Sequence, residues 1–283
     1  TSALREAITN VEGVLVRYAP LTREVLQAST KLRVIAKHGV GLDNVNIAAA
    51  AELGIIVCNT PDANTEAVAE LALGLMIALS RNVLASDALV RTGRWDEKDE
   101  ATDRELFGAT LGLVGCGRIG SRLAQKCRAA FDMTVLAYDP FVNGGDLAAR
   151  GIVKAGTLNE LLSAADYVSV HTPLTPATRG IMGAEQFSLM KRTAFFINTS
   201  RGPVVDESAL QKGQIAGAAL DVFAKEPPDS ENPLLRMSNV VLLPHMGAAT
   251  QEAMVKMATH AAGELLSVLR GEQPRYQVSP TVR

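Results

Sequence analysis

The stretch Thr110-Leu-Gly-Leu-Val-Gly-Cys-Gly-Arg-Ile-Gly-Ser121, followed by Thr134-Val-Leu-Ala-Tyr-Asp139, decides the fold of this chain. In order, it contains an apolar strand, a glycine turn, a helix, a second strand and a terminal acid, as in a dinucleotide-binding unit. Gly115 permits the tight turn, Gly117 lets the backbone approach a pyrophosphate, and Gly120 lets the helix pack against the strand. The stretch therefore predicts a Rossmann-like unit.

The end of this unit indicates which dinucleotide binds. Arg118 and Ile119 begin the predicted helix, whose free N–H groups and partial positive charge suit phosphates. Asp139 lies about 20 residues past the last glycine, where an acid accepts hydrogen bonds from the adenosine ribose and repels a ribose phosphate. An ordinary glycine turn is the alternative, but the strand, helix, second strand and acid in register favour a dinucleotide site. Because the acid repels a ribose phosphate, NAD is favoured over NADP as the cofactor.

Composition excludes several classes of protein. The chain has 283 residues, of which 47% are hydrophobic and 20% charged, so it can bury a large core in one or two domains. The net charge of -2 offers no basic field for nucleic acid. The three cysteines form no metal-like pair, and a reducing cytoplasm is the expected compartment. The longest apolar run, Leu71 to Leu79, is too short to span a bilayer, so no membrane is expected. No metal is expected either, because the cysteines form no such pair.

Short apolar runs alternate with helical patterns, which predicts an α/β fold with parallel sheets. The charged loop from Thr92 to Arg104 contains the only tryptophan, Trp95, and we expect a domain boundary there. Asn64 is predicted to cap a long helix with an apolar stripe from Val68 to Leu79. The predicted strands are Gly13–Val16, Val34–Ala36, Ile55–Val57, Leu111–Val114, Val135–Tyr138, Tyr167–Val170, Ala194–Ile197, Ala218–Leu220 and Val240–Leu243, and the further helices include Thr22–Ala28, Asn46–Leu53, Val83–Arg91 and Thr250–Arg270.

Polar residues directly follow several of the predicted strands. Ligands of an open parallel sheet bind beyond the carboxyl ends of its strands, where the strand order reverses. This position alone therefore predicts a binding site. The residues in question are His171 with Thr172, Asn198 to Arg201, Asp221 and His245.

Three charged or titratable residues suit acid chemistry. Arg201 stands before Gly202 and offers a fixed fork of donors for a carboxylate or a 2-oxo acid carbonyl; the alternative is that it ties its loop to Asp206. Glu226, ahead of two prolines, could simply be exposed, and His245 could cap the next helix. A histidine held by a carboxylate is nevertheless what reversible proton transfer near neutral pH requires.

The order of the glycine fingerprint, Asp139, Arg201, Glu226 and His245 resembles the D-isomer-specific 2-hydroxyacid dehydrogenase family, especially its 3-phosphoglycerate dehydrogenase branch. The resemblance covers nearly the whole chain. It implies two Rossmann-like domains with parallel sheets flanking an active-site cleft: a substrate domain of residues 1–92 plus 252–283 and an NAD-binding domain of residues 93–251. Its further motifs are Lys37–Val45, Asn59–Glu70 and His171–Thr175.

The resemblance also implies a role for each site residue. Arg201 would anchor the substrate, His245 would act as acid and base, and Glu226 would orient His245 and stabilise its charged form. Substrate-binding residues would be Arg17 for a second anionic group, Val40 and Gly41 for the carboxylate through their N–H groups, and Thr65 near the nicotinamide. The remaining cofactor-binding residues would be Asp221 at the carboxamide, Thr172 and Pro173 along the ribose, and His171, Thr199 and Gly247.

These roles imply an NAD-dependent enzyme that interconverts a D-2-hydroxy acid and its 2-oxo acid. Arg17 points to 3-phosphoglycerate and 3-phosphohydroxypyruvate of serine biosynthesis, although a surface arginine is the alternative and His38 and Tyr18 depart from the family pattern. A glyoxylate or hydroxypyruvate reductase is the runner-up. A formate dehydrogenase is disfavoured, because its relatives carry glutamine in place of Glu226.

Two further expectations follow from the resemblance. An NADH-sensing corepressor, like the C-terminal binding proteins, is an alternative of another class, which turnover would distinguish. A homodimer is expected to form through the helices between Asn64 and Arg91. The segment from Asp206 to Gly213 is about one helical turn shorter than family members usually show.

Overall fold

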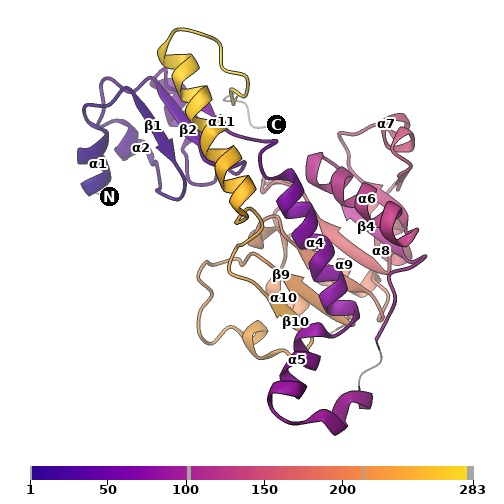
Figure 1. The fold of residues 1–283 in the computed structure, drawn as a ribbon. Coiled ribbons are helices and arrows are strands. Elements are labelled where there is room, and N and C mark those ends of the chain that lie inside the picture. The colour runs from indigo at the N-terminus through magenta and orange to yellow at the C-terminus, as the bar shows by residue number, and fades with distance from the viewer. Residues whose placement is uncertain (1, 101–102, 213, 279–283) are drawn as a thin grey trace. The chain divides into compact units, whose positions relative to one another are not determined.

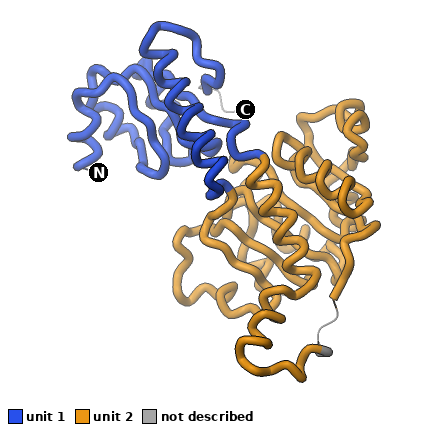
Figure 2. The backbone as a smooth tube through the Cα atoms, in the orientation of Figure 1, with its two compact units in different colours: residues 1–65, 248–283 blue, residues 66–247 orange. Residues whose placement is uncertain are grey.

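The computed structural model describes residues 2–100, 103–212 and 214–278 (Figure 1). The chain divides into two compact units (Figure 2). Unit 1 comprises Thr1–Thr65 and Ala248–Arg283, and unit 2 comprises Glu66–Gly247. Each unit has its own parallel sheet, in agreement with the α/β fold predicted from the sequence.

Unit 1 is built on a three-stranded parallel sheet in the order β1-β2-β3. The three predicted strands are confirmed to within one residue. The last predicted helix is also confirmed, and it packs against all three strands. The elements are α1 (Ser2–Ile8), β1 (Gly13–Val16), α2 (Arg23–Leu26), β2 (Val34–Lys37), α3 (Ile47–Glu52), β3 (Ile56–Cys58) and α11 (Gln251–Leu269).

Unit 2 is built on a seven-stranded parallel sheet in the order β10-β9-β8-β7-β4-β5-β6. The elements are α4 (Thr65–Ser80), which begins at the unit boundary, α5 (Val83–Arg91), η1 (Trp95–Glu100), β4 (Thr110–Val114), α6 (Arg118–Phe131), β5 (Thr134–Tyr138), α7 (Gly144–Ala149), β6 (Val153–Lys154), α8 (Leu158–Ala164), β7 (Tyr167–Val170), α9 (Ala184–Leu189), β8 (Phe195–Asn198), η2 (Gly202–Val204), α10 (Glu207–Leu210), β9 (Gly217–Leu220), η3 (Pro233–Arg236) and β10 (Val240–Leu242).

Strand register places the candidate residues at one edge of this sheet. Val114, the last residue of β4, lies opposite Tyr138 and Val170, and Asn198 lies opposite Val170 and Leu220. The carboxyl ends of five strands therefore lie level. The chain order reverses between β4 and β7, which is where ligands of such sheets bind.

The two faces of the unit 2 sheet bury separate cores because successive strand residues point to opposite sides. Leu113 and Ile197 pack with residues of α4 and α6 on one face. Val170 and Phe196 pack with residues of α8, α9 and α10 on the other. Helices on both faces bury the central strands β4, β7, β8 and β9, as is usual for parallel sheets, whereas β6 at the edge is exposed.

The unit boundary differs from the predicted boundary near residue 92. Ala72, Leu75 and Met76 of α4 are buried in the same core as Leu111 and Leu113 of β4. The apolar stripe of α4 therefore packs on the sheet of unit 2, although the sequence order suggested unit 1. The spacing predicted a buried helix face, but it did not specify which sheet would cover that face.

Two local predictions also need correction. Asn64 precedes α4 as predicted, but its Oδ1 accepts no hydrogen bond in the described part of the chain, so the capping bond is not formed. Strand β6 is not predicted from the sequence, because its two residues are both exposed at the sheet edge and show no alternation of buried and exposed positions.

Two segments singled out in the sequence are only partly described. Thr92–Arg104 contains η1, and residues 101–102 lie outside the described residues. The short segment after Asp206 forms the four-residue helix α10, and residue 213 of that segment is not described.

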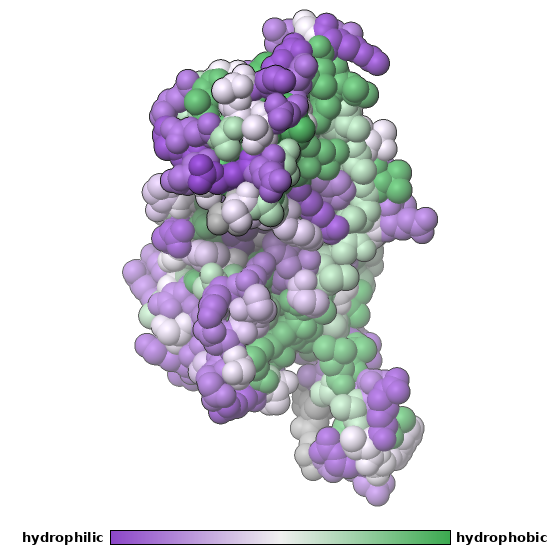
Figure 3. Space-filling view, turned by 90° about the vertical axis from the view of Figure 1, so that its left-hand side faces the viewer, coloured by the Kyte–Doolittle hydropathy of each residue, from purple (hydrophilic) through white to green (hydrophobic). Residues whose placement is uncertain are grey.

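Helix α5 has no buried residue. Its Leu84 and Val90 are 57% and 58% exposed, and Trp95 just beyond it is 61% exposed. Figure 3 shows one face of the molecule on which hydrophobic residues are gathered beside hydrophilic ones. Among the described helices, none alone is long and apolar enough to cross a membrane; α4 and α5 pass that test only as a pair, bent by 60° at the break between them.

Candidate active site

The glycine turn after β4 leaves room for a ligand but none for side chains at two of its positions. Gly115 has a φ of +91°, and a Cβ there would lie 3.0 Å from the backbone of His171. A Cβ at Gly120 would lie 2.5 Å from the carbonyl oxygen of Gly115. At Gly117 a Cβ would meet no atom within 4 Å, and no side chain caps the 14-residue helix α6 that follows. An open helix amino terminus with free N–H groups fits a pyrophosphate.

Asp139 is fixed beside this turn. It is 9% exposed, and its two carboxylate oxygens accept hydrogen bonds from the backbone N–H groups of Cys116 and Phe141, both at 2.9 Å. Each carboxylate oxygen keeps a further lone pair. The acid is therefore oriented by the backbone and can still accept hydrogen bonds from ribose hydroxyls.

Two threonine hydroxyls just beyond the carboxyl ends of β7 and β8 are buried and could each bind a polar group of a ligand. Thr172 Oγ1 and Thr199 Oγ1 make no hydrogen bond in the part of the chain that the structure describes. A buried polar atom left without a partner costs about 1–3 kcal/mol. These hydroxyls, the glycine turn and Asp139 together fit a dinucleotide laid across the strand ends.

His171 is neutral at physiological pH. Burial lowers the pKa of its imidazole to about 4, and its Nε2 lies 2.9 Å from the hydroxyl of Ser169. Its backbone lies against Gly115, beneath the glycine turn. His171 therefore supports the turn as a neutral ring and is unsuited to exchange protons near neutral pH.

Asp221, at the end of β9, holds the loop that carries His245. Its carboxylate is almost fully buried and accepts hydrogen bonds from the N–H groups of Met246 (2.6 Å) and Gly247 (2.8 Å), while its carbonyl accepts the N–H of His245 (2.8 Å). Burial raises the pKa of this carboxyl, and the two backbone donors oppose that rise. Asp221 thus has a structural role in addition to the cofactor role predicted for it.

His245 and Glu226 form a pair. His245 Nδ1 lies 2.8 Å from Glu226 Oε2, and Glu226 Oε1 accepts the backbone N–H of Phe223 at 3.1 Å. His245 has a φ of +56°, a conformation that costs a residue with a side chain about 1–3 kcal/mol and that tends to persist at functional sites. Because a carboxylate only accepts, Nδ1 is the donor, which leaves Nε2 to exchange a proton with a ligand.

Arg201 lies in a loop shaped by Asn198, the last residue of β8. Asn198 Oδ1 accepts the N–H and the hydroxyl of Ser200, and its amide donates to the Arg201 carbonyl at 3.0 Å. Asp206, the alternative partner considered for Arg201, accepts from the N–H and hydroxyl of Ser208 and caps α10.

Gly202 brings this loop against the loop of Glu226. A Cβ at Gly202 would lie 1.9 Å from the carbonyl carbon and oxygen of Phe223, so the two backbones touch. Arg201 and Glu226 therefore stand on loops that are packed together, one after β8 and one after β9.

The predicted substrate-binding residues Arg17, Val40, Gly41 and Thr65 lie in unit 1. Among the described residues, no hydrogen bond is donated by the N–H groups of Val40 and Gly41, while the Val40 carbonyl accepts from the Asn59 amide at 2.9 Å. Thr65 Oγ1 is buried and likewise without a partner among those residues. These groups are available to a polar ligand.

Arg17 makes two contacts that the sequence does not predict, one with Tyr18 and one with Lys37. The Arg17 guanidinium lies 4.6 Å from the centre of the Tyr18 ring. Lys37, buried at the end of β2, donates to the Arg17 carbonyl and to Asn44 Oδ1. Lys37 stood inside a quoted motif, but its bond to Arg17 depends on the pairing of β1 with β2.

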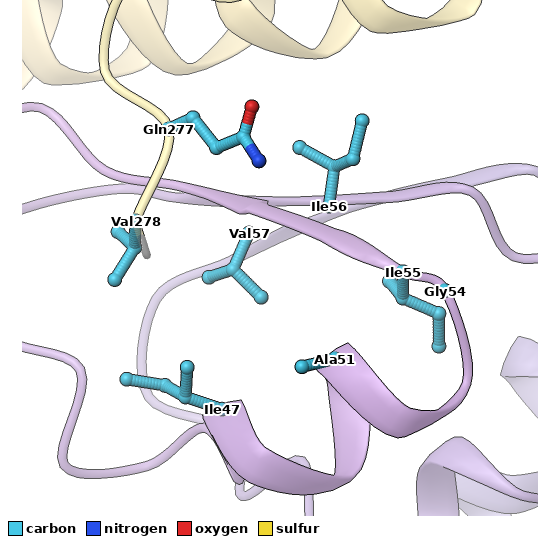
Figure 4. A pocket seen from close by; sticks show the side chains of 8 residues that line it. All are labelled: Ile47, Ala51, Gly54, Ile55, Ile56, Val57, Gln277 and Val278. Atoms are coloured by element: carbon cyan, nitrogen blue, oxygen red, sulfur yellow. The ribbon is translucent and has the colours of Figure 1, made fainter. Parts of the chain in front are cut away.

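A separate pocket in unit 1 carries no comparable chemistry. It lies between α3, β3 and the segment at Gln277, and Figure 4 shows mostly aliphatic side chains around it. None of its lining residues is titratable; they are Ile47, Ala51, Gly54, Ile55, Ile56, Val57, Gln277 and Val278. Within the described residues, no group of three His, Cys, Asp or Glu side chains could hold a metal ion.

Residues 73–247 match the family model of the D-isomer specific 2-hydroxyacid dehydrogenase, NAD binding domain. The chain belongs to the D-isomer-specific 2-hydroxyacid dehydrogenase family. The family resemblance, the fold class and the NAD cofactor predicted from the sequence are confirmed.

Similar proteins carry several enzyme names. The chain is 43% identical to the D-3-phosphoglycerate dehydrogenase of Methanocaldococcus jannaschii over 95% of its own length and 52% of that relative's. It thus spans about half of that protein. It is 43% identical to the glyoxylate reductase of Thermofilum pendens over 92% of this chain and 78% of that one. The D-lactate dehydrogenase of Aquifex aeolicus, solved with NAD and lactic acid, has a TM-score of 0.86 and 30% identity, covering 95% and 86% of the two chains.

The state of His171 predicts a pH-dependent stability. The unfolded histidine has a pKa of about 6.5 and the folded one about 4, so the unfolded state binds more protons between these values. Neutral His171 makes its full contribution to the free energy of unfolding above pH 6.5, and this contribution is lost as the pH falls toward 4. We expect the advantage of the wild type over His171→Gln, measured by denaturant unfolding, to shrink by about 1–3 kcal/mol over that range. Parallel pH curves for the two proteins would contradict this.

Proposed function

We propose that this chain is an NAD-dependent D-2-hydroxyacid dehydrogenase that interconverts a D-2-hydroxy acid and its 2-oxo acid. The observation that carries the proposal is the His245–Glu226 pair, with 2.8 Å between Nδ1 and Oε2. Glu226 lies on a loop that packs against the loop of Arg201. A protein that only binds a dinucleotide has no need of such an acid–base pair. The family to which the chain belongs agrees with this chemistry.

The proposed residue roles follow from their bonding capacity. When bound, NADH would supply the hydride that reduces the 2-oxo carbon. Protonated His245 would give the proton from Nε2 to the oxygen and become neutral, with its remaining proton on Nδ1. Glu226 would stabilise the protonated form before the transfer through its contact with Nδ1, and Arg201 would bind the substrate oxygens. In the direction of oxidation His245 accepts the proton again. We assign the open N–H groups of Val40 and Gly41 to the substrate carboxylate and Thr65 to the nicotinamide side.

The substrate we propose is 3-phosphoglycerate with its product 3-phosphohydroxypyruvate, in serine biosynthesis. Arg17 supports a second anionic group on the substrate, and similarity to phosphoglycerate dehydrogenases agrees with it. Glyoxylate or hydroxypyruvate is the second candidate, favoured by the packing of Arg17 on Tyr18 and by the equal similarity to a glyoxylate reductase. The buried, unpaired cysteines suit the reducing cytoplasm in which we place the protein.

The activity is tested by following NADH absorbance with 3-phosphohydroxypyruvate, hydroxypyruvate and glyoxylate in parallel. We expect turnover with at least one acid and a fall in kcat/KM of about 10²–10⁴ in His245→Ala, because the proton donor is lost. His260→Ala, on the exposed face of α11, is the matched control and should retain activity. NADH binding without turnover by the wild type would instead support an NADH-sensing protein.

We further propose that the chain forms a homodimer through α4 and α5. Helix α5 buries none of its own residues, and a short helix exposing Leu84 and Val90 is marginal in water without a covering surface. A second copy would supply that surface.

Sedimentation velocity tests the dimer. We expect Leu84→Asp with Val90→Asp to convert a dimer into a monomer, because each buries a charge in the proposed interface. Val153→Asp is the matched control, since Val153 is 56% exposed on β6 and should leave the dimer unchanged. A wild-type monomer at micromolar concentration, or a dimer that survives both substitutions, would refute the proposal.

A further inference from the structure

The loop between β9 and η3, residues 221–232, carries Glu226 but contains no helix or strand. Residues 224–227 are exposed, so little side-chain burial holds that stretch in place. A loop of this kind loses conformational entropy when it is ordered, and it needs specific bonds to stay in one conformation. Within the loop such bonds include the Lys225–Asp229 ion pair and the hydrogen bond from Asn232 N–H to the Asp229 carbonyl at 2.9 Å.

Glu207 binds both ends of this loop from outside. Its Oε1 accepts the backbone N–H of Ala224 at 2.6 Å, and its Oε2 accepts the side-chain amide of Asn232 at 3.0 Å. Ala224 lies two residues before Glu226. One half-buried carboxylate therefore joins the start and the end of the loop, through charge-assisted bonds stronger than neutral ones.

We call the two hydrogen bonds of Glu207, to Ala224 and to Asn232, the Glu207 clamp. Both sides of this clamp are anchored in the core of unit 2. On the side of Glu207, the last two residues of α10, Ala209 and Leu210, are buried. On the other side, Asn232 Oδ1 accepts the N–H of Leu234, which is completely buried in the same core. The clamp therefore transmits the rigidity of the core to a loop that is itself exposed.

We propose that Glu207 is a positioning residue for the Glu226–His245 pair. The inference rests on the proposed function, because it assigns Glu207 a part in the same proton transfer. Glu207 acts through the backbone of the loop, and its two carboxylate oxygens are already bonded to Ala224 and Asn232. A general preference for acids at helix starts does not explain these bonds, since α10 has only four residues.

Steady-state kinetics give the first test. At saturating NADH we expect Glu207→Ala to lower kcat for the preferred 2-oxo acid about 10- to 100-fold, as displacement of a catalytic pair does, and to leave NADH affinity by fluorescence unchanged. Glu207→Gln keeps one acceptor oxygen and should recover part of the loss. Glu185→Ala is the matched control, because Glu185 is an exposed acid in the first turn of the short helix α9.

A spectroscopic readout separates this inference from the proposed activity. The chain has four histidines, and ¹⁵N-labelled imidazoles can be assigned with His245→Ala. In the neutral form, wild-type His245 should hold its proton on Nδ1 facing Glu226, whereas in Glu207→Ala the ring should shift toward the tautomer mixture of a free histidine. This measurement needs no turnover, so it remains decisive if the activity proposal fails.

The kinetic and tautomer measurements together decide whether Glu207 positions the Glu226–His245 pair. Reduced kcat together with an altered His245 tautomer in Glu207→Ala, and neither change in Glu185→Ala, supports the positioning role. Wild-type kcat or an unchanged tautomer in a folded Glu207→Ala overturns it. If Glu207→Ala does not fold, Glu207→Gln is judged by the same two readouts. Turnover that survives His245→Ala would refute the proposed activity and not the clamp.

Discussion

The contact of the Gly202 backbone with the peptide between Phe223 and Ala224 is the constraint on which the rest of the site depends. No side chain fits at Gly202, because a Cβ would lie 1.9 Å from the carbonyl carbon of Phe223. The contact follows from the sheet, in which β8 and β9 are neighbours and Asn198 lies opposite Leu220. It sets the loop of Arg201 against the loop of Glu226, so that the two loops are in contact although they are distant in sequence.

A second constraint completes the arrangement from β9. Asp221 uses its carboxylate and carbonyl to hold three consecutive N–H groups, from His245 to Gly247. Without these bonds the left-handed conformation of His245 would be unfavourable by about 1–3 kcal/mol. The buried acid therefore stabilises the turn that presents the imidazole to Glu226. The chemistry is thus positioned largely by backbone contacts at the ends of neighbouring strands.

Much of this could be predicted from the sequence because it depends on local pattern. The glycine turn, Asp139 and nearly all strands follow from residue spacing, and Arg201, Glu226 and His245 were singled out by their position and by family resemblance. The destination of α4 was not predictable, since an apolar stripe does not specify its partner. Glu207 was missed because its bonds cross 17 and 25 residues and leave no periodic signal. The neutrality of His171 likewise depends on burial that only the fold creates.

Whether the Gly202 contact holds the site together is tested most directly by kcat/KM of Gly202→Ala with the preferred 2-oxo acid, alongside NADH affinity and the circular dichroism spectrum. A methyl group at this position must separate the two loops, and a displacement of about 1 Å costs roughly 100-fold in rate. We expect such a fall in a folded protein that still binds NADH, since the glycine turn after β4 is untouched. A folded Gly202→Ala variant with kcat/KM close to that of the wild type would contradict it.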